Sequence, residues 1–258
     1  MKIFICIDDT DSLESRGTGE LAEMIADAIE KKWNGKRSEI TRHQLLLHED
    51  IPYTSHNSSM CFEAEIEEQY LESVITYASN FLKEESEPEA DPGLCVATLD
   101  YLENKDELID FGYKAKKEIL IKEKAYGLAD KLGIHLSEHG GNGQGVIGAL
   151  AGVGLRLSGN DGWFKGAHKI KTSDNIIKVR ELCKYKNIDK VRNLDGKCLD
   201  GDEEIELGKL IKSMLIEGEA VVLVEEIKEG ERARVKWRTC SKQRLLKIGE
   251  NNVNVVYK

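Results

Sequence analysis

Three aspartates follow the first apolar segment of the chain and are the clearest candidates for chemistry. Residues 2–7 are apolar after Lys2 and include three isoleucines, which predicts a buried strand, and Asp8, Asp9 and Asp11 follow it closely. Neighbouring carboxylates repel one another unless a cation or protons relieve the repulsion. Mg²⁺ is typically held by one or two carboxylates together with nucleotide phosphates. We therefore expect Asp8 and Asp9 to bind Mg²⁺; turn and helix capping by Asp and Ser side chains is the alternative.

A glycine-rich segment is the second candidate. Five of the nine residues from 140 to 148 are glycine, and an apolar helix is expected to follow. Glycine lets backbone amides approach an anion, and the free N–H groups at the start of a helix attract phosphate. The segment fits neither the Walker pattern, because no Gly-Lys-Ser or Gly-Lys-Thr follows, nor the dinucleotide pattern, because no strand is predicted before it. Phosphate binding is one interpretation, and close helix packing at Gly148 and Gly152 is the other.

Three histidines are further candidates. His135 and His139 are four residues apart, with Glu138 between them. On a helix they would share a face and could hold a metal, but the sequence offers no third ligand and glycines directly after His139 end any helix, so we expect a structural or surface role. His56 and Asn57 lie in a loop rich in hydroxyl groups. That loop either contacts a substrate or forms a hydrogen-bonded turn.

Charge is distributed unevenly along the chain, whose formal net charge is −10 at pH 7. Residues 166–258 carry 20 Lys and Arg against 16 Asp and Glu, which gives +4 and leaves −14 on residues 1–165. An acidic body of this kind is not typical of a general nucleic-acid binder. Four cations alternate with apolar residues and would share one face of a strand, either contacting phosphate or RNA or forming a solvated surface. They are Arg232, Arg234, Lys236 and Arg238.

Composition excludes several protein classes. With 40% hydrophobic and 33% charged residues and three prolines, the chain has the composition of a folded globular protein rather than a disordered one. No apolar run approaches the roughly 20 residues needed to cross a bilayer. None of the six cysteines has the spacing of a zinc ribbon or a thioredoxin motif. Free thiols in apolar runs fit a reducing compartment, so we expect a cytoplasmic protein with no membrane contact.

The hydrophobic periodicity predicts an α+β fold. Strands are expected at residues 2–7, 40–47, 60–66 and 94–99, and helices over 21–29, over 70–82 and, as a pair, within 105–132. The order strand-helix-strand-strand-helix-strand matches a split βαβ, ferredoxin-like unit. Beyond a turn at residues 158–162 the chain is strand-rich, at 221–225, 233–238 and 253–257. We expect two domains, a nucleotide-binding region at 1–160 and a small β-rich module at 161–258.

Four motifs together resemble one known family in their order and spacing. They are IDDTDS at residues 7–12, IPY at 51–53, DPG at 91–93 and GQGVIGALA at 143–151, and the chain that carries them is similar over about its first 155 residues to the archaeal tRNA-isoleucine agmatinylcytidine synthetases. This resemblance implies a kinase-like part built around the motifs, beside a ferredoxin-like domain. It also implies the use of ATP, which that family spends to join agmatine to a cytidine of an isoleucine tRNA through a phosphorylated cytidine.

The resemblance also implies roles for individual residues. Asp8, Asp9 and Asp11 would serve Mg²⁺ and ATP. The family's Met-Cys-Thr-Thr run, whose threonine is phosphorylated, is replaced by GTGE at residues 17–20, which leaves Thr18 as the hydroxyl of the catalytic set. The family's Arg-Gly-Asn-Gly loop is replaced by HNSS at 56–59, so His56 and Asn57 are the expected substrate contacts. The expected nucleotide contacts are Thr10, Ser12, Asn142, Gly143, Gln144 and Gly145.

The leading hypothesis is an ATP- and Mg²⁺-dependent phosphotransferase or ligase of this kind, with an unknown small-molecule or RNA acceptor. The family's zinc ribbon and nucleic-acid-binding fold have no counterpart in this sequence. One alternative is a non-catalytic nucleotide or phosphate sensor. Another is an RNA-binding accessory protein that uses the basic segment from Arg232 to Arg238. A homodimer is left open.

Overall fold

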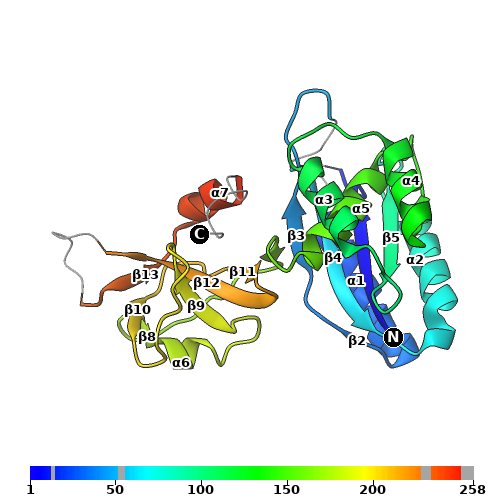
Figure 1. The fold of residues 1–258 in the computed structure, drawn as a ribbon. Helices are drawn as coiled ribbons and strands as arrows, with labels where there is room; N and C mark the ends of the chain where they lie inside the picture. The colour runs from blue at the N-terminus through cyan, green and yellow to red at the C-terminus, as the bar shows by residue number, and fades with distance from the viewer. Residues whose placement is uncertain (13–14, 52–55, 228–233, 251–258) are drawn as a thin grey trace. The chain divides into compact units, whose positions relative to one another are not determined.

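The computed structural model describes residues 1–12, 15–51, 56–227 and 234–250, and these separate into two compact units (Figure 1). Unit 1 is Met1–Ser158 and unit 2 is Gly159–Lys258. Both units contain strands and helices, so the α+β class expected from the sequence is confirmed.

Unit 1 is built on an antiparallel sheet with the strand order β6-β5-β1-β4-β3. A short strand β2 also pairs with β4. The bounds are β1 Lys2–Asp8, β2 Lys36–Arg37, β3 Thr41–Gln44, β4 Ser58–Glu65, β5 Gly93–Thr98 and β6 His135–Glu138. Strand β3 is shorter than expected because after Gln44 the backbone turns to other partners: the Leu46 amide donates to the Ala115 carbonyl at 3.1 Å.

Helices cover both faces of this sheet. Side chains of β1 alternate between the faces, so Ile3, Ile5 and Ile7 pack on one side and Phe4 and Cys6 on the other. The isoleucine side is covered by α1 (Thr18–Trp33) and α2 (Leu71–Glu85), the latter preceded by a 3₁₀ turn, η1 (Glu68–Tyr70). The Cys6 side is covered by α3 (Lys105–Ala115), α4 (Lys122–Leu132) and α5 (Gly145–Leu157).

Helix α5 is buried on nearly every side, and its glycines are what make that possible. A methyl group at Gly154 would lie 2.0 Å from the Leu108 carbonyl oxygen of α3, and one at Gly152 would lie 2.4 Å from Cys6 Sγ of β1. Real Cβ atoms do not come this close to their neighbours, so glycine is required at both positions. The helix-packing interpretation of Gly152 is therefore supported by the geometry.

Three buried thiols lie in one row across the sheet. Cys6 is directly opposite Cys61 of β4 on one side and Cys95 of β5 on the other. All three side chains have no exposed surface, and burial raises the pKa values of Cys6 and Cys95 well above the usual value for a thiol. Cys198, in unit 2, is exposed. All six cysteines are free thiols in the described structure, including Cys6, Cys61 and Cys95, for which the apolar runs predicted it.

The segment before the glycines differs from its prediction. The spacing of His135 and His139 leaves a helix open, and the sequence predicts no strand there. Residues His135–Glu138 instead form β6, an edge strand whose register pairs His135 with Val96 and Glu138 with Gly93. The reason is tertiary: β5 offers a free strand edge, and the segment pairs with it. The Ser137 hydroxyl lies 2.9 Å from Nε2 of both His135 and His139, and these hydrogen bonds are consistent with a structural role for the two histidines.

Unit 2 is a strand-rich module. Its sheet runs β7-β11-β12-β13-β10-β8, and β9 pairs with β12. The strand bounds are β7 Trp163–Phe164, β8 Ile176–Lys178, β9 Lys190–Asn193, β10 Glu204–Glu206, β11 Ser213–Ile216, β12 Glu219–Glu226 and β13 Trp237–Thr239. Two helices, α6 (Val179–Leu182) and α7 (Lys242–Glu250), complete the unit.

The predicted basic strand is wrong in its extent. Arg234 and Lys236 lie in a bend, and β13 begins only at Trp237; Arg232 falls outside the described residues. These cations form salt bridges with acids on other elements. The nitrogen–oxygen distances are 3.8 Å for Arg234 and Asp174, 3.5 Å for Lys236 and Glu226, and 4.0 Å for Arg238 and Glu206. The described part of this segment is therefore a bend and a short strand rather than one alternating strand, and its contact with phosphate or RNA stays a prediction.

None of the helices in the described ranges combines the length and apolar character that crossing a bilayer requires.

The tight packing of α5 predicts opposite effects of two Gly→Ala substitutions. Gly154→Ala should destabilise the protein by about 1–3 kcal/mol or more, because the added methyl group meets backbone. Gly127→Ala, inside α4 with open space around it, should stabilise by about 0.5–1 kcal/mol through helix propensity. Urea unfolding followed by circular dichroism measures both. A Gly154→Ala protein as stable as the wild type would contradict the close approach.

Candidate active site

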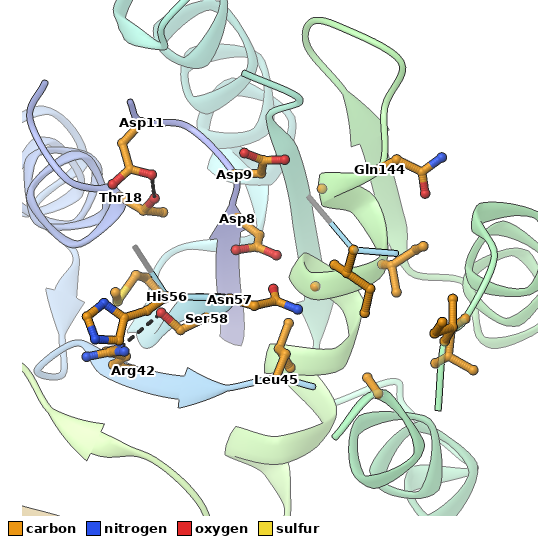
Figure 2. A pocket seen from close by; sticks show the side chains of 18 of the residues that line it. Asp8, Asp9, Asp11, Thr18, Arg42, Leu45, His56, Asn57, Ser58 and Gln144 are labelled. Atoms are coloured by element: carbon orange, nitrogen blue, oxygen red, sulfur yellow. Dashed lines mark hydrogen bonds between the residues drawn. The ribbon is translucent and has the colours of Figure 1, made fainter. Parts of the chain in front are cut away.

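A cavity of about 560 Å³ opens in unit 1 where β1 ends. Its wall brings together segments far apart in the sequence: Asp8 at the end of β1 with Asp9 and Asp11 after it, Thr18 at the start of α1, and Gln144 before α5 (Figure 2). The convergence of the acidic segment and the glycine-rich segment, which the sequence interpretation required, is therefore present in the fold.

Asp8 and Asp9 are held where their charges are costly. Asp8 is buried, and a methyl group at Gly148 of α5 would lie 1.7 Å from Asp8 Oδ2, so the helix backbone lies directly against the carboxylate. Burial first, and then the charges of Asp9 and Asp11, raises the pKa of Asp8 well above its usual value. Burial, followed by the charges of Asp91 and Asp11, raises the pKa of Asp9 to about 6. A bound cation would relieve this repulsion.

The oxygen chemistry of this pair fits Mg²⁺. The described residues contain no group of three or more His, Cys, Asp or Glu side chains arranged to hold a metal ion. Mg²⁺ does not need such a cage, because it commonly takes one or two carboxylates and completes its shell with water and substrate phosphates. Asp8 and Asp9 offer hard carboxylate donors at the cavity wall, which is the donor set that such a site uses.

A chain of hydroxyl groups connects the acidic segment to α1. Thr10 Oγ1 donates to Thr18 Oγ1 at 3.1 Å, and Thr18 Oγ1 donates in turn to Asp11 Oδ1 at 3.2 Å, the contact drawn in Figure 2. The Thr18 hydroxyl therefore donates its hydrogen bond to a carboxylate that could accept the proton, the arrangement that activates a hydroxyl as a nucleophile. Thr10 itself is buried behind this contact and does not line the cavity.

The start of α1 also supplies backbone amides that have no acceptor among the described residues. The N-cap residue Gly17 provides no side-chain cap, and the first backbone bond runs from the Glu20 amide to the Gly17 carbonyl at 2.8 Å. The amides of Thr18 and Gly19 precede that bond, and both residues line the cavity. Free N–H groups and the helix dipole favour an anion at such a position.

The glycine-rich segment has a different local structure from the phosphate-binding loop considered for it. The Gly145 amide donates to the Asp91 carbonyl at 3.1 Å and the Ile147 amide to the Gln144 carbonyl at 3.1 Å, so these donors are already used. The close-packing interpretation accounts for Gly145 and Gly148. Asn142, Gln144 and Gly145 line the cavity, whereas Gly143 does not.

Asp91 holds the glycine-rich segment in place. Its Oδ1 accepts hydrogen bonds from the amides of Asn142 and Gly143, the latter at 3.3 Å. On the other side of the segment, Lys122 Nζ donates to the Asn142 carbonyl at 2.6 Å and to Glu138 Oε2 at 3.2 Å. The sequence placed Asp91 in a motif but assigned it no role. Its position before β5, opposite a glycine turn, is what gives it this function.

Of the remaining predicted site residues, two line the cavity and one does not. His56 and Asn57 line the cavity, and Asn57 Nδ2 also donates to the Leu46 carbonyl at 2.7 Å, so it supports the loop as well. Ser12 is not part of the wall; its amide donates to Ser15 Oγ at 2.8 Å. Arg42 of β3 lines the cavity and was missed, because nothing in its local sequence distinguishes it from a solvent-facing strand residue.

Comparison with known proteins agrees with the resemblance in the sequence. No protein-family model matches the chain. The chain is 29% identical over 159 residues to the tRNA-isoleucine 2-agmatinylcytidine synthetase TiaS of Methanosarcina acetivorans. The match covers 60% of this chain and 36% of that protein. The chain thus spans about a third of the relative's length, and the resemblance to this family is confirmed over 60% of the chain.

Solved structures give the same result. Apo TiaS is 26% identical with a TM-score of 0.51, and the complex of TiaS with its isoleucine tRNA and ATP is 26% identical with a TM-score of 0.52. Each covers 60% of this chain, and the chain covers 35% and 36% of those proteins. A tRNA fluorescent labelling enzyme matches at 27% identity and a TM-score of 0.51. The similarity covers the same share of the chain, 60%, in each case.

The contacts of Asp91 predict a local effect of its removal. Asp91→Ala deletes the acceptor of two amides, so hydrogen exchange at Asn142 and Gly143 should accelerate about tenfold or more. Asp91→Asn keeps an acceptor oxygen at the same position and should exchange nearly as slowly as the wild type. Hydrogen exchange read by NMR measures both. Equal protection in the wild type and in Asp91→Ala would show that the segment is held by other contacts.

Proposed function

We propose that unit 1 binds Mg²⁺–ATP in the cavity at the end of β1 and acts as an ATP-dependent phosphotransferase or ligase related to TiaS. The observation that carries this proposal is the presence, in one cavity, of a buried and a partly buried carboxylate, a helix start and a threonine hydroxyl bonded to a third carboxylate. The match to an enzyme whose structure contains ATP supports the choice of nucleotide.

We also propose the finer subdivision of the fold. The strand order β5-β1-β4-β3, antiparallel throughout and with α1 and α2 on one face, supports a ferredoxin-like assignment for this part of unit 1. The segment from α3 to α5 would then be the kinase-like part that completes the cavity. On this division residues 1–160 form the nucleotide-binding region and residues 161–258 a separate β-rich domain.

The proposed chemistry assigns a task to each residue on the wall. Asp8 and Asp9 would hold Mg²⁺, which when bound neutralises charge on the phosphates. The amides of Thr18 and Gly19 and the side chains of Asn142 and Gln144 would orient the nucleotide. Thr18 Oγ would then attack the γ-phosphorus as its proton passes to Asp11 Oδ1, and the bond from that phosphorus to the bridging oxygen would break to release ADP.

For the final acceptor of the phosphoryl group we propose only a chemical class. The similar enzymes act on an isoleucine tRNA, so an RNA cytidine is one acceptor for the phosphoryl group and a small molecule is the other. His56 and Asn57 line the wall where that acceptor would enter. The formal charge of −14 on residues 1–165 disfavours a long RNA contact on unit 1 alone. Homodimer formation stays a prediction.

Removal of either carboxylate should weaken metal-dependent nucleotide binding. Asp8→Asn and Asp9→Asn each delete one donor of the proposed Mg²⁺ site, so titration calorimetry should find ATP affinity lowered at least about tenfold in the presence of Mg²⁺. Asp110→Asn, an exposed acid on α3, is the matched control and should bind ATP like the wild type.

Three outcomes separate the hypotheses. No Mg²⁺-dependent ATP binding by the wild type would refute the proposed function. Binding with no ADP release above a heat-inactivated control would leave the nucleotide sensor. Binding that Asp8→Asn and Asp9→Asn leave unchanged would place the nucleotide elsewhere.

The role of Thr18 predicts a covalent product. Incubation of the wild type with Mg²⁺–ATP should add one phosphoryl group to the intact protein, because Thr18 Oγ is the proposed nucleophile. Thr18→Ala should give no adduct and Thr18→Ser should retain it, as measured by intact-protein mass spectrometry with peptide mapping. A phosphoryl group on another residue, or an adduct that persists in Thr18→Ala, would contradict this assignment.

A further inference from the structure

Arg42 occupies a special place in the sheet of unit 1. It lies opposite Met60 of β4, and Met60 lies opposite Ile7 of β1, so the three residues form one row across three strands. Directly opposed residues of an antiparallel pair point to the same face. Ile7 packs against α1, and Arg42 therefore projects from the α1 face of the sheet, the face on which Thr18 begins its helix.

Asp8 projects from the other face. It follows Ile7 in the strand, and its carboxylate lies against Gly148 of α5. The cavity therefore extends around the end of the sheet, with Asp8 and the α5 segment on one side and Arg42 and Thr18 on the other. A phosphoryl group that leaves a nucleotide bound near Asp8 and reaches Thr18 must pass to the Arg42 side.

The partners of Arg42 leave its charge uncompensated. Its Nε donates to Ser58 Oγ at 3.0 Å and its Nη2 to Gln44 Oε1 at 3.1 Å, and both acceptors are neutral. Among the described residues no carboxylate lies within ion-pair distance of it. Burial lowers the pKa of the guanidinium from its usual value. Arg37 in the same unit shows the structural alternative: it is also recessed, and it contacts the three carboxylates of Asp27, Glu30 and Glu39.

Arg42 is also the one permanent cation among the described residues that line the cavity, whose other ionisable wall residues are His56 and five acids. The acids are Asp8, Asp9, Asp11, Asp50 and Glu118. A recessed arginine, positioned by neutral hydrogen bonds and facing such a wall, has free N–H donors for a planar anion with several oxygens.

We propose that Arg42 binds the terminal phosphate of the nucleotide during its transfer to the Thr18 side of the cavity. This inference rests on the proposed function and adds a residue to it. The two Ser58 and Gln44 contacts fix the guanidinium plane, and the phosphate oxygens accept hydrogen bonds from the nitrogens that remain. Charge that develops on the transferring group is then met by a fixed cation, which is how arginines act in other phosphoryl transfers.

The test compares nucleotides that differ by one phosphate. In titration calorimetry with Mg²⁺, Arg42→Gln should lose about tenfold or more in ATP affinity and keep the wild-type affinity for ADP, which also shows that the variant is folded. Arg42→Lys keeps the charge but not the planar guanidinium group, so its ATP affinity should lie between those of the wild type and Arg42→Gln. Arg180→Gln removes an exposed, ion-paired arginine of unit 2 and is the matched control. Equal losses for ATP and ADP, or no loss, would overturn the inference.

A second measurement separates this inference from the proposed function. In protein labelled with ¹⁵N-arginine, the Nε–H signal of Arg42 is identified by its loss in Arg42→Gln. Titration with inorganic pyrophosphate, without ATP, should shift that signal and not the Nε–H signal of Arg180. A shift in a wild-type protein that binds no ATP would retain Arg42 as an anion site while the proposed function fails. No shift with pyrophosphate or ATP would overturn the role of Arg42.

Discussion

The close docking of helix α5 against the ends of β1 and β5 is the contact on which unit 1 depends. A methyl group on Gly93 would lie 2.2 Å from the Gly145 carbonyl carbon, and one on Gly145 would lie 2.2 Å from the Asp91 carbonyl oxygen. The helix therefore meets the sheet backbone to backbone at its first turn. This contact brings two segments separated by more than half the chain to one wall, and it removes water from the carboxylate of Asp8.

The same contact explains the electrostatics of the cavity. Because α5 excludes solvent from Asp8, the carboxylates that follow β1 are held close together in a medium that screens them poorly. Asp9 also adopts a φ of 52°, a left-handed conformation that costs a residue with a side chain some free energy. The raised carboxylate pKa values at Asp8 and Asp9 and the strained backbone at Asp9 are therefore found in adjacent residues. Such a concentration of cost is typical of a site organised around a ligand rather than around its own stability.

The sequence predicts the parts of this site that depend on local patterns. An apolar run followed by acids indicates a strand end, which identifies Asp8 and Asp9, and glycines before an apolar segment indicate a helix start. The family resemblance adds Asn142 and Gln144 at that helix start. Their convergence also required the family resemblance, because local patterns contain no information on which strand end meets which helix.

The misses share one physical cause, which is dependence on distant partners. The orientation of Arg42 follows from its register with Met60, and the strand at His135–Glu138 exists because β5 has an edge to pair with. The sequence predicts a binding face at Arg234 and Lys236 because it does not show that acids of other elements form salt bridges with these cations. None of these partners lies within the window of sequence in which a periodicity can be recognised.

The row of buried thiols at Cys6, Cys61 and Cys95 can report the opening of unit 1 through its chemical reactivity. These sulfurs meet an alkylating reagent only when the sheet and α5 separate, whereas the exposed Cys198 of unit 2 reacts in the native state. The order in which the cysteines become modified would therefore record the opening of unit 1 with no label added to the chain. A nucleotide that ties α5 to β1 would slow the three inner reactions and leave the outer one unchanged.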